Sequence, residues 1–180
     1  EILRAIEACP LERFVVLPNN KNVIASAQQA AEQTSKQVSV LPTRSIPQGV
    51  AATLALNSDL SFEDTIAAME RAMAAVRSAE VTRAVRATVI DGRRIEMGQA
   101  IGLIDGALRV VADDVAAAAR ACVEAMLFPD ASLLTLYSGE DVRDEDAAAL
   151  AEELRASQPD LEVELVHGGQ PHYPYLLSLE

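Results

Sequence analysis

A polar turn of three asparagines and a lysine is the first stretch whose residue types could do chemistry. It consists of Asn19, Asn20, Lys21 and Asn22, and it follows the apolar run of residues 14–17. Amides, an ammonium group and the N–H groups of a following helix could bind an anion at the carboxyl end of a strand. The turn lacks glycine, so a phosphate could not approach its backbone as in a P-loop. The alternative is structural, because Asn20 would also serve as the N-cap of a helix over residues 20–34.

A second polar turn stands in the equivalent position after the next strand-like segment, residues 37–41. It contains Thr43, Ser45 and Gln48, whose hydroxyl and amide groups could line one crevice together with the first turn. A structural interpretation is again open, since Ser45 suits an N-cap and Pro47 suits the first turn of a helix.

Residues of the types that serve in metal sites or catalysis are present, but their spacing matches no metal-binding or catalytic motif. His167 and His172 lie on either side of Gly-Gly-Gln-Pro, with no third ligand at metal-binding spacing. Ser138 does not lie in a GxSxG motif, and the adjacent Glu140 and Asp141 point their side chains in different directions. We therefore expect no catalytic residue and no metal site in this chain.

The charge of the chain disfavours nucleic acid as a partner. The net charge is -12, and residues 130–165 hold eleven acids against Arg143 and Arg155, a local balance of -9. Nucleic acids are bound by neutralising phosphates with Lys and Arg. The basic residues concentrate at five positions that we interpret as solvated strand and hairpin sites, namely Arg77, Arg83, Arg86, Arg93 and Arg94.

The two cysteines, the lack of a long apolar stretch and the N-terminal residues bear on the cellular compartment and the extent of the chain. Cys9 and Cys122 are single and lie outside any CxxC motif, so we expect neither a disulfide framework nor a zinc site. No stretch reaches the roughly 18 apolar residues of a membrane span, and no signal peptide is evident, which favours a cytoplasmic protein. Ile2, Leu3 and Ile6 recur at helical spacing without an initiating Met, so we expect an N-terminally truncated fragment.

Strand and helix patterns alternate along residues 1–79, and this alternation predicts a parallel α/β lobe. After the second turn, a helix is expected to run to about Asn57, and Ser61 with Asp64 resembles a capping box for the next helix.

The pattern changes at Glu80, and residues 80–180 predict an α+β lobe with hairpins and a mixed sheet. Asp91-Gly92 and Asp105-Gly106 are strong hairpin signals. They are followed by a helix over about 113–127, a buried strand over 133–137, a helix capped by Asp144, a strand over 161–165 and a final strand.

Resemblance to a known family rests on four stretches: VVLPNNKNVIASAQQAAE, VSVLPTRSIPQGVAATLALN, TRAVRATVIDGRRIEMGQAIGLIDG and GGQPHYPYLLSLE. They resemble the C-terminal region of the fatty acid kinase A subunit, whose family is dihydroxyacetone kinase-like. The resemblance implies a parent protein with an N-terminal kinase domain that uses ATP and Mg²⁺, a central domain and this C-terminal domain. It further implies that the kinase phosphorylates a fatty acid carried by a separate DegV-type protein, which feeds phospholipid synthesis.

By this resemblance the chain is expected to be non-catalytic and to hold no cofactor itself. Its expected partners are the DegV-type fatty-acid-binding protein and the kinase and central domains of the parent chain. The alternative is that a lipid or small anionic ligand binds in a crevice between the two lobes.

The C-terminal region is also similar to the two-lobed DegV fold. DegV proteins carry Gly-Thr-His and Gly-Pro-Gly near the fatty acid carboxylate, whereas residues 168–174 here read GGQPHYP. This exchange argues against fatty acid binding in the DegV manner. We take nine residues as candidate ligand or partner contacts: Asn19, Asn20, Lys21, Asn22, Thr43, Ser45, Gln48, Gly169 and Gln170.

Overall fold

The chain divides into two compact units, residues 1–76 and 77–180, in a computed structural model that describes residues 1–90 and 92–180. The change of sequence pattern at Glu80 predicts a boundary a few residues later. The first strand of unit 2 already begins at Arg77, because Ser78 and Glu80 pair within the sheet although they are polar. No helix of the described residues is long and apolar enough to cross a membrane.

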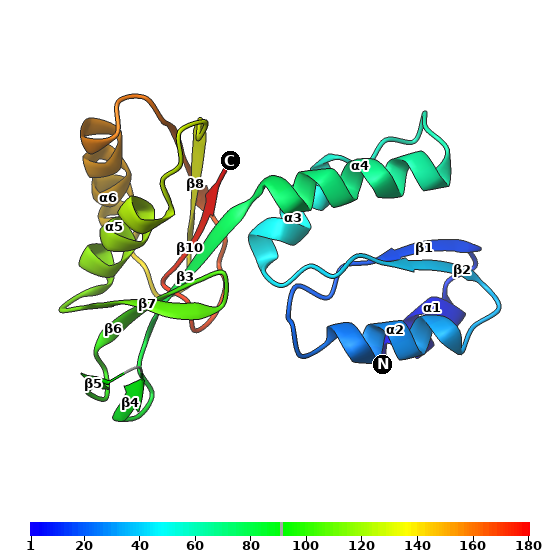
Figure 1. Cartoon of the computed structure of the whole chain (residues 1–180), viewed down its shortest axis with the longest axis horizontal. Helices are drawn as coiled ribbons and strands as arrows, with labels where there is room; N and C mark the ends of the chain where they lie inside the picture. The colour runs from blue at the N-terminus through cyan, green and yellow to red at the C-terminus, as the bar shows by residue number, and fades with distance from the viewer. Residues whose placement is uncertain (91) are drawn as a thin grey trace. The chain divides into compact units, whose positions relative to one another are not determined.

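Unit 1 has the parallel α/β organisation that the sequence predicts (Figure 1). Its elements are α1 (Ile2–Ala8), β1 (Arg13–Val16), α2 (Ile24–Glu32), β2 (Gln37–Val40), α3 (Ile46–Leu54) and α4 (Phe62–Ala75). The strands β1 and β2 pair in parallel, with Phe14 opposite Val38. Leu41, Ala52 and Met69 form the centre of a small core.

Side-chain caps set the starts of α3 and α4. The N–H of Gln48 donates to Oγ of Ser45 at 3.4 Å, and Pro47 lies in the first turn of α3. The N–H of Asp64 donates to Oγ of Ser61 at 3.1 Å, while the same hydroxyl donates to the Asp64 carboxylate at 2.7 Å. Both caps confirm the sequence-based expectation, because each satisfies a helix N–H that has no partner inside the helix.

The expected cap at Asn20 is wrong. Helix α2 begins at Ile24 with Val23 as its N-cap residue. Oδ1 of Asn20 instead accepts the N–H of Asn22 at 2.9 Å, and its main-chain oxygen accepts the N–H of Val23 at 3.0 Å. Asn20 therefore closes a separate turn before the helix, an alternative to helix that short polar side chains offer the backbone.

Unit 2 is built on a mixed sheet of six strands in the order β7-β6-β3-β10-β8-β9. Only the β8–β9 pair is parallel. The elements of the unit are β3 (Arg77–Arg83), β4 (Thr88–Ile90), β5 (Arg93–Ile95), β6 (Ala100–Ile104), β7 (Ala107–Ala112), α5 (Val115–Met126), β8 (Leu133–Ser138), α6 (Asp144–Ser157), β9 (Glu162–His167) and β10 (Tyr175–Leu179). The helices α5 and α6 pack together on the sheet, and their buried faces share one core with its strands (Figure 1).

Two hairpins and one helix start bear on the sequence predictions for this unit. Asp105 and Gly106 have positive φ angles of 49° and 78° in the turn between β6 and β7, which confirms that hairpin. The strands β4 and β5 also pair as a hairpin, although Asp91 of its predicted turn lies outside the described residues. The expected cap by Asp144 is wrong, because Arg143 is the N-cap residue and Asp144 already belongs to α6.

Candidate functional site

The two polar turns of unit 1 meet at Asn19. Its main-chain N–H donates to Oγ1 of the fully buried Thr43 at 3.0 Å. Asn19 has a φ of 54°, in the left-handed region that Asn tolerates better than most residues. Its side-chain amide lies on α3, where a Cβ added to Gly49 would be only 2.2 Å from the amide oxygen. The end of β1 is thus fastened both to the turn after β2 and to α3.

Few donors remain free at the start of α3 for binding an anion. Pro47 has no N–H, and the N–H of Gln48 is already bonded to Ser45. The N–H of Arg44 donates to Oε1 of Gln48 at 2.8 Å. The contacts of Thr43, Ser45 and Gln48 therefore favour the structural interpretation of this turn over a phosphate cradle.

The remaining residues of the first turn face solvent. Asn20, Lys21 and Asn22 are exposed. Their side chains are open to solvent, whereas Asn19 and Thr43 hold the two turns together.

A shallow apolar hollow lies beside these turns, along α3. Its volume is about 240 Å³, and it is lined by Leu17, Asn19, Ile46, Gly49, Val50, Thr53 and Leu54. Leu54 is 81% exposed and Ile46 is 44% exposed, so the hollow continues into apolar surface. Oδ1 of Asn19 is buried at its edge with no hydrogen-bond partner among the described residues. Pockets for drug-sized molecules occupy about 300–1,000 Å³, so this hollow suits contact with a protein side chain better.

The second set of candidates, Gly169 and Gln170, forms a tight turn in unit 2. Nε2 of Gln170 donates to the main-chain oxygens of Tyr137 and Tyr173, each at 3.0 Å. Gly169 has a φ of 62°, and its N–H donates to the carbonyl of Ser138 at 3.0 Å. Gly139 is required beside this turn, because a Cβ there would lie 2.4 Å from the Tyr173 carbonyl oxygen. Both candidates therefore shape the turn through their own hydrogen bonds.

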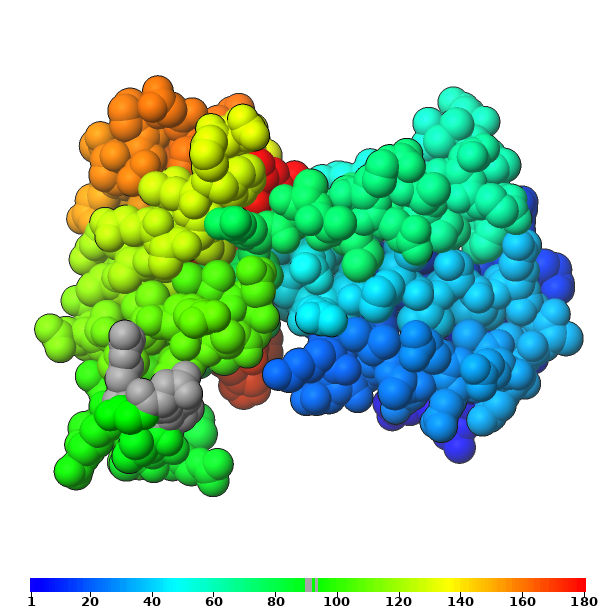
Figure 2. Space-filling view, in the orientation of Figure 1, coloured from blue at the N-terminus to red at the C-terminus, as the bar shows by residue number. Residues whose placement is uncertain are grey.

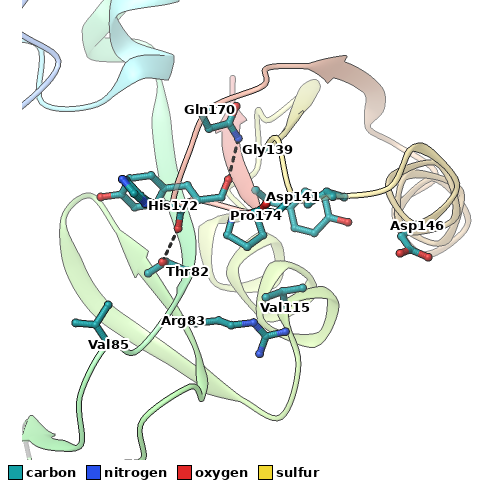
Figure 3. A pocket seen from close by; sticks show the side chains of 13 residues that line it. Thr82, Arg83, Val85, Val115, Gly139, Asp141, Asp146, Gln170, His172 and Pro174 are labelled. Atoms are coloured by element: carbon teal, nitrogen blue, oxygen red, sulfur yellow. Dashed lines mark hydrogen bonds between the residues drawn. The ribbon is translucent and has the colours of Figure 1, made fainter.

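A cavity of about 530 Å³ opens beside this turn, wholly within unit 2 (Figure 3). It is lined by Thr82, Arg83, Val85, Val115, Gly139, Asp141, Val142, Asp146, Gln170, His172, Tyr173, Pro174 and Tyr175. Oγ1 of Thr82 donates to the His172 carbonyl at 2.8 Å, which ties β3 to the turn. The sequence interpretation missed this cavity, because its lining brings together residues of β3, α5, α6 and β10 with the loops over 139–142 and 170–174. The only local signal was the Tyr-Pro-Tyr string.

Two tyrosine hydroxyls in the cavity wall are kept protonated. Burial raises the pKa of Tyr173, and the negative charge of Glu80 raises it further. Burial also raises the pKa of Tyr175, with a smaller contribution from Asp146. Both hydroxyls therefore stay protonated near neutral pH, where they can donate hydrogen bonds but cannot act as bases.

Metal ligands do not gather in the part of the chain that the structure describes. Across residues 1–90 and 92–180, no three His, Cys, Asp or Glu side chains lie close enough to hold a metal ion. The nine candidate contacts are divided between the units, with Asn19 to Gln48 in unit 1 and Gly169 and Gln170 in unit 2.

The sequence profile of one protein family, the FakA-like C-terminal domain of fatty acid kinase, matches residues 1–180. The protein YloV of Bacillus subtilis is 36% identical over 180 residues, which are all of this chain and 32% of YloV. An uncharacterized protein of Staphylococcus haemolyticus is 39% identical over the same length, which is 33% of that protein. The chain thus spans about a third of the length of the curated relatives it matches.

Solved structures with the same fold include a DegV family protein, a fatty acid kinase B3 protein and a dihydroxyacetone kinase. A DegV family protein from Corynebacterium glutamicum superposes with a TM-score of 0.65 at 14% identity, over 99% of this chain and 77% of that one. The fatty acid kinase B3 protein of Streptococcus pneumoniae, loaded with linoleic acid, gives 0.65 at 15% identity, over 99% and 74%. The dihydroxyacetone kinase of C. freundii gives 0.62 at 15% identity, over 99% and 40%. These likenesses establish the DegV-like fold.

Proposed function

This chain belongs to the FakA-like C-terminal family of fatty acid kinase, and from that premise we propose that it is a non-catalytic docking module. Its partner is a DegV-type fatty-acid-binding protein, which it holds so that the bound acyl chain can be phosphorylated. The phosphorylation itself takes place in the kinase domain of the full-length protein, where ATP and Mg²⁺ act. The family match over the whole chain is the observation that carries this proposal.

Exposed apolar side chains support a docking role. Three large apolar side chains lie within thirteen positions of unit 2, where Val85, Val89 and Met97 are 88%, 67% and 73% exposed. Large apolar side chains gathered on a surface mark contact sites for other proteins. By contrast, neither candidate site brings a nucleophile and a neighbouring base together among its described residues, so we assign the module no reaction of its own.

A competition assay, in which the isolated chain is added to the reaction of the full-length parent kinase, tests this function. We expect an excess of the isolated chain to slow acyl phosphate formation by the full-length kinase, because it sequesters the fatty-acid-loaded partner. Adding more partner should restore the rate, and the binding of ATP by the kinase should not change. An unchanged rate at a chain concentration of about 100 μM, well above the micromolar Kd expected for a specific transient complex, would rule out the docking role.

A second candidate function is binding of a small amphipathic ligand in the cavity of unit 2. Its volume of about 530 Å³ lies within the range of small-molecule pockets. Thr82, Arg83 and Tyr173 provide polar groups in its wall, beside the apolar Val85 and Val115. Native mass spectrometry of the chain purified from bacteria tests this candidate: a bound lipid or anion supports it, and a clean apo mass counts against it.

A further inference from the structure

The β4–β5 hairpin is exposed and isolated from the main sheet of unit 2. Its strands have three residues each and pair only with one another. The hairpin stands away from the body of the unit in Figure 1, and Figure 2 shows the same green segment projecting from the surface of that unit. An isolated two-stranded hairpin is marginally stable in water unless something covers it.

The base of the hairpin is firmly held. The N–H of Ala84 donates to the Gln99 carbonyl at 2.9 Å, and the N–H of Gly98 donates to the Ala84 carbonyl at 2.7 Å. Ile95 is only 1% exposed. The hairpin is thus a folded extension with a fixed origin, suited to presenting side chains at a defined position.

Three large apolar side chains of this segment have no cover. Val85 is 88% exposed, Val89 is 67% exposed and Met97 is 73% exposed. Water contact at three such residues within thirteen positions is unfavourable, and covering them with an apolar surface would release free energy. Methionine is also one of the residues enriched in protein interfaces.

The same segment is basic in an otherwise acidic chain. Residues 83–97 hold four arginines against Asp91 and Glu96, a local balance of +2 in a chain of net charge -12. Arg86 is exposed and has no partner among the described residues, and Arg94 pairs only with Glu96, where both side chains are more than half exposed. Such exposed pairs contribute little stability, so both arginines remain available to acidic groups on another molecule.

From these features we propose that the β4–β5 hairpin is the docking element of the chain, and that it engages an apolar patch rimmed by acidic side chains on the partner protein. The inference rests on the proposed docking function and adds the surface and the chemistry of its partner. Arginine around an apolar centre is a common composition for a protein interface, and the opposite charges would also accelerate association.

A second copy of this chain would be a poorer partner for the β4–β5 hairpin. Helix α6 of that copy could supply negative charge to the hairpin arginines, with Asp144, Glu145 and Asp146 in its first turn. However, none of the exposed large apolar side chains of the described residues lies in α6. The helix therefore provides the acidic rim without the apolar centre that the hairpin requires.

Titration of hairpin variants with a DegV-type fatty-acid-binding protein loaded with oleic acid tests the inference. We expect R86E/R94E and V89S/M97S each to weaken binding by about tenfold or more, the size of effect typical of interface anchors. The charge variant should also reduce the dependence of Kd on salt. Matched controls in unit 1, R71E and the exposed L11S, should bind within about twofold of the unchanged chain. L54S tests α3 as a rival docking surface.

The outcomes separate the two proposals. Unchanged binding by both hairpin variants, with the unchanged chain still binding, overturns the inference and leaves the docking function intact. Loss of binding in L54S alone also overturns it and moves the docking surface to α3. No binding by the unchanged chain overturns both.

Concentration-dependent dimers of the chain alone, abolished by R86E/R94E, would assign the hairpin to a second copy and likewise overturn the inference. Circular dichroism of each variant confirms that it is folded.

Discussion

The main-chain N–H of Asn19 donates a hydrogen bond to Oγ1 of Thr43 at 3.0 Å, and this contact joins two turns that lie 24 positions apart. It holds Asn19 in its left-handed conformation and places the Asn19 amide on α3. The most polar stretch of unit 1 is therefore used largely to fasten its own loops together. The residues at the edge of that stretch, Asn20, Lys21 and Asn22, are exposed to solvent.

Replacing Thr43 by Val should destabilise unit 1. The substitution keeps the size of the fully buried side chain but removes the acceptor for the Asn19 N–H. An unsatisfied buried donor costs about 1–3 kcal/mol, so the free energy of unfolding in urea should fall by that amount. Thr43→Ser keeps the hydroxyl and should lose less. Equal losses for Val and Ser would show that the hydrogen bond is unimportant.

Asn19 and Gly49 should be energetically coupled. Alanine is favoured over glycine in a helix by about 1 kcal/mol, yet a Cβ at Gly49 would collide with the Asn19 amide. We expect Gly49→Ala to destabilise the chain by about 1–2 kcal/mol. Combined with Asn19→Gly, which also suits the positive φ, the same change should become neutral or stabilising. A double-mutant cycle in urea measures this, and additive effects would contradict it.

Lys36 should hold the C-terminal end of α1. Its ammonium donates to the carbonyls of Ile6 at 2.9 Å and Cys9 at 2.6 Å, and it lies 5.3 Å from the centre of the Phe14 ring. Lys36→Met keeps much of the stem but removes the donors, and at this half-buried site we expect a loss of about 1–2 kcal/mol. Protection of α1 amides from hydrogen exchange should fall as well. The control is the exposed Lys21→Met, which should change neither quantity.

The two cysteines should differ in reactivity. Burial raises the pKa of the Cys122 thiol from 9.0 to about 12, while Cys9 is partly exposed. A thiol-specific reagent at pH 8 should therefore modify Cys9 first in the native chain and both thiols in denaturant. Equal rates for the two native thiols would contradict the burial of Cys122.

The same pKa shift implies that stability decreases in alkali. The unfolded chain releases the Cys122 proton near pH 9 and the native chain retains it to about pH 12, so the stabilisation present below pH 9 is lost across that window. The raised pKa values of Tyr173 and Tyr175 act in the same direction. In Cys122→Ala the free energy of unfolding should depend less steeply on pH between 9 and 12, and an unchanged slope would argue against the assignment.

The sequence predicted the elements whose signals are local. Periodicity and caps located α3 and α4, Asp105-Gly106 located a hairpin, and alternating patterns separated a parallel unit from a mixed one. Asn20 was misassigned because an asparagine that caps a helix and one that closes a turn have the same sequence appearance. The first main-chain hydrogen bond of α2 runs from the N–H of Ala27 to the Val23 carbonyl, so the helix starts after the turn that Asn20 closes.

The sites depend on contacts between distant segments, which one sequence cannot specify. Asn19 meets Gly49 only because β1 and β2 pair in parallel and α3 follows. Tyr175 enters the cavity of unit 2 because β10 lies between β3 and β8, although those strands are far apart in the chain. The exposure of Val89 and Met97 likewise requires knowing that their hairpin pairs with no other strand.

The docking role is tested most directly by isothermal titration of the 180-residue chain with a fatty-acid-loaded DegV-type protein from the same organism. We expect saturable one-to-one binding with a Kd of tens of micromolar or tighter, which corresponds to about -6 kcal/mol or better. The affinity should weaken as salt is raised, because the arginines of the hairpin are exposed to screening. Absence of any binding heat, together with unchanged sedimentation of both proteins at about 100 μM, would contradict the account.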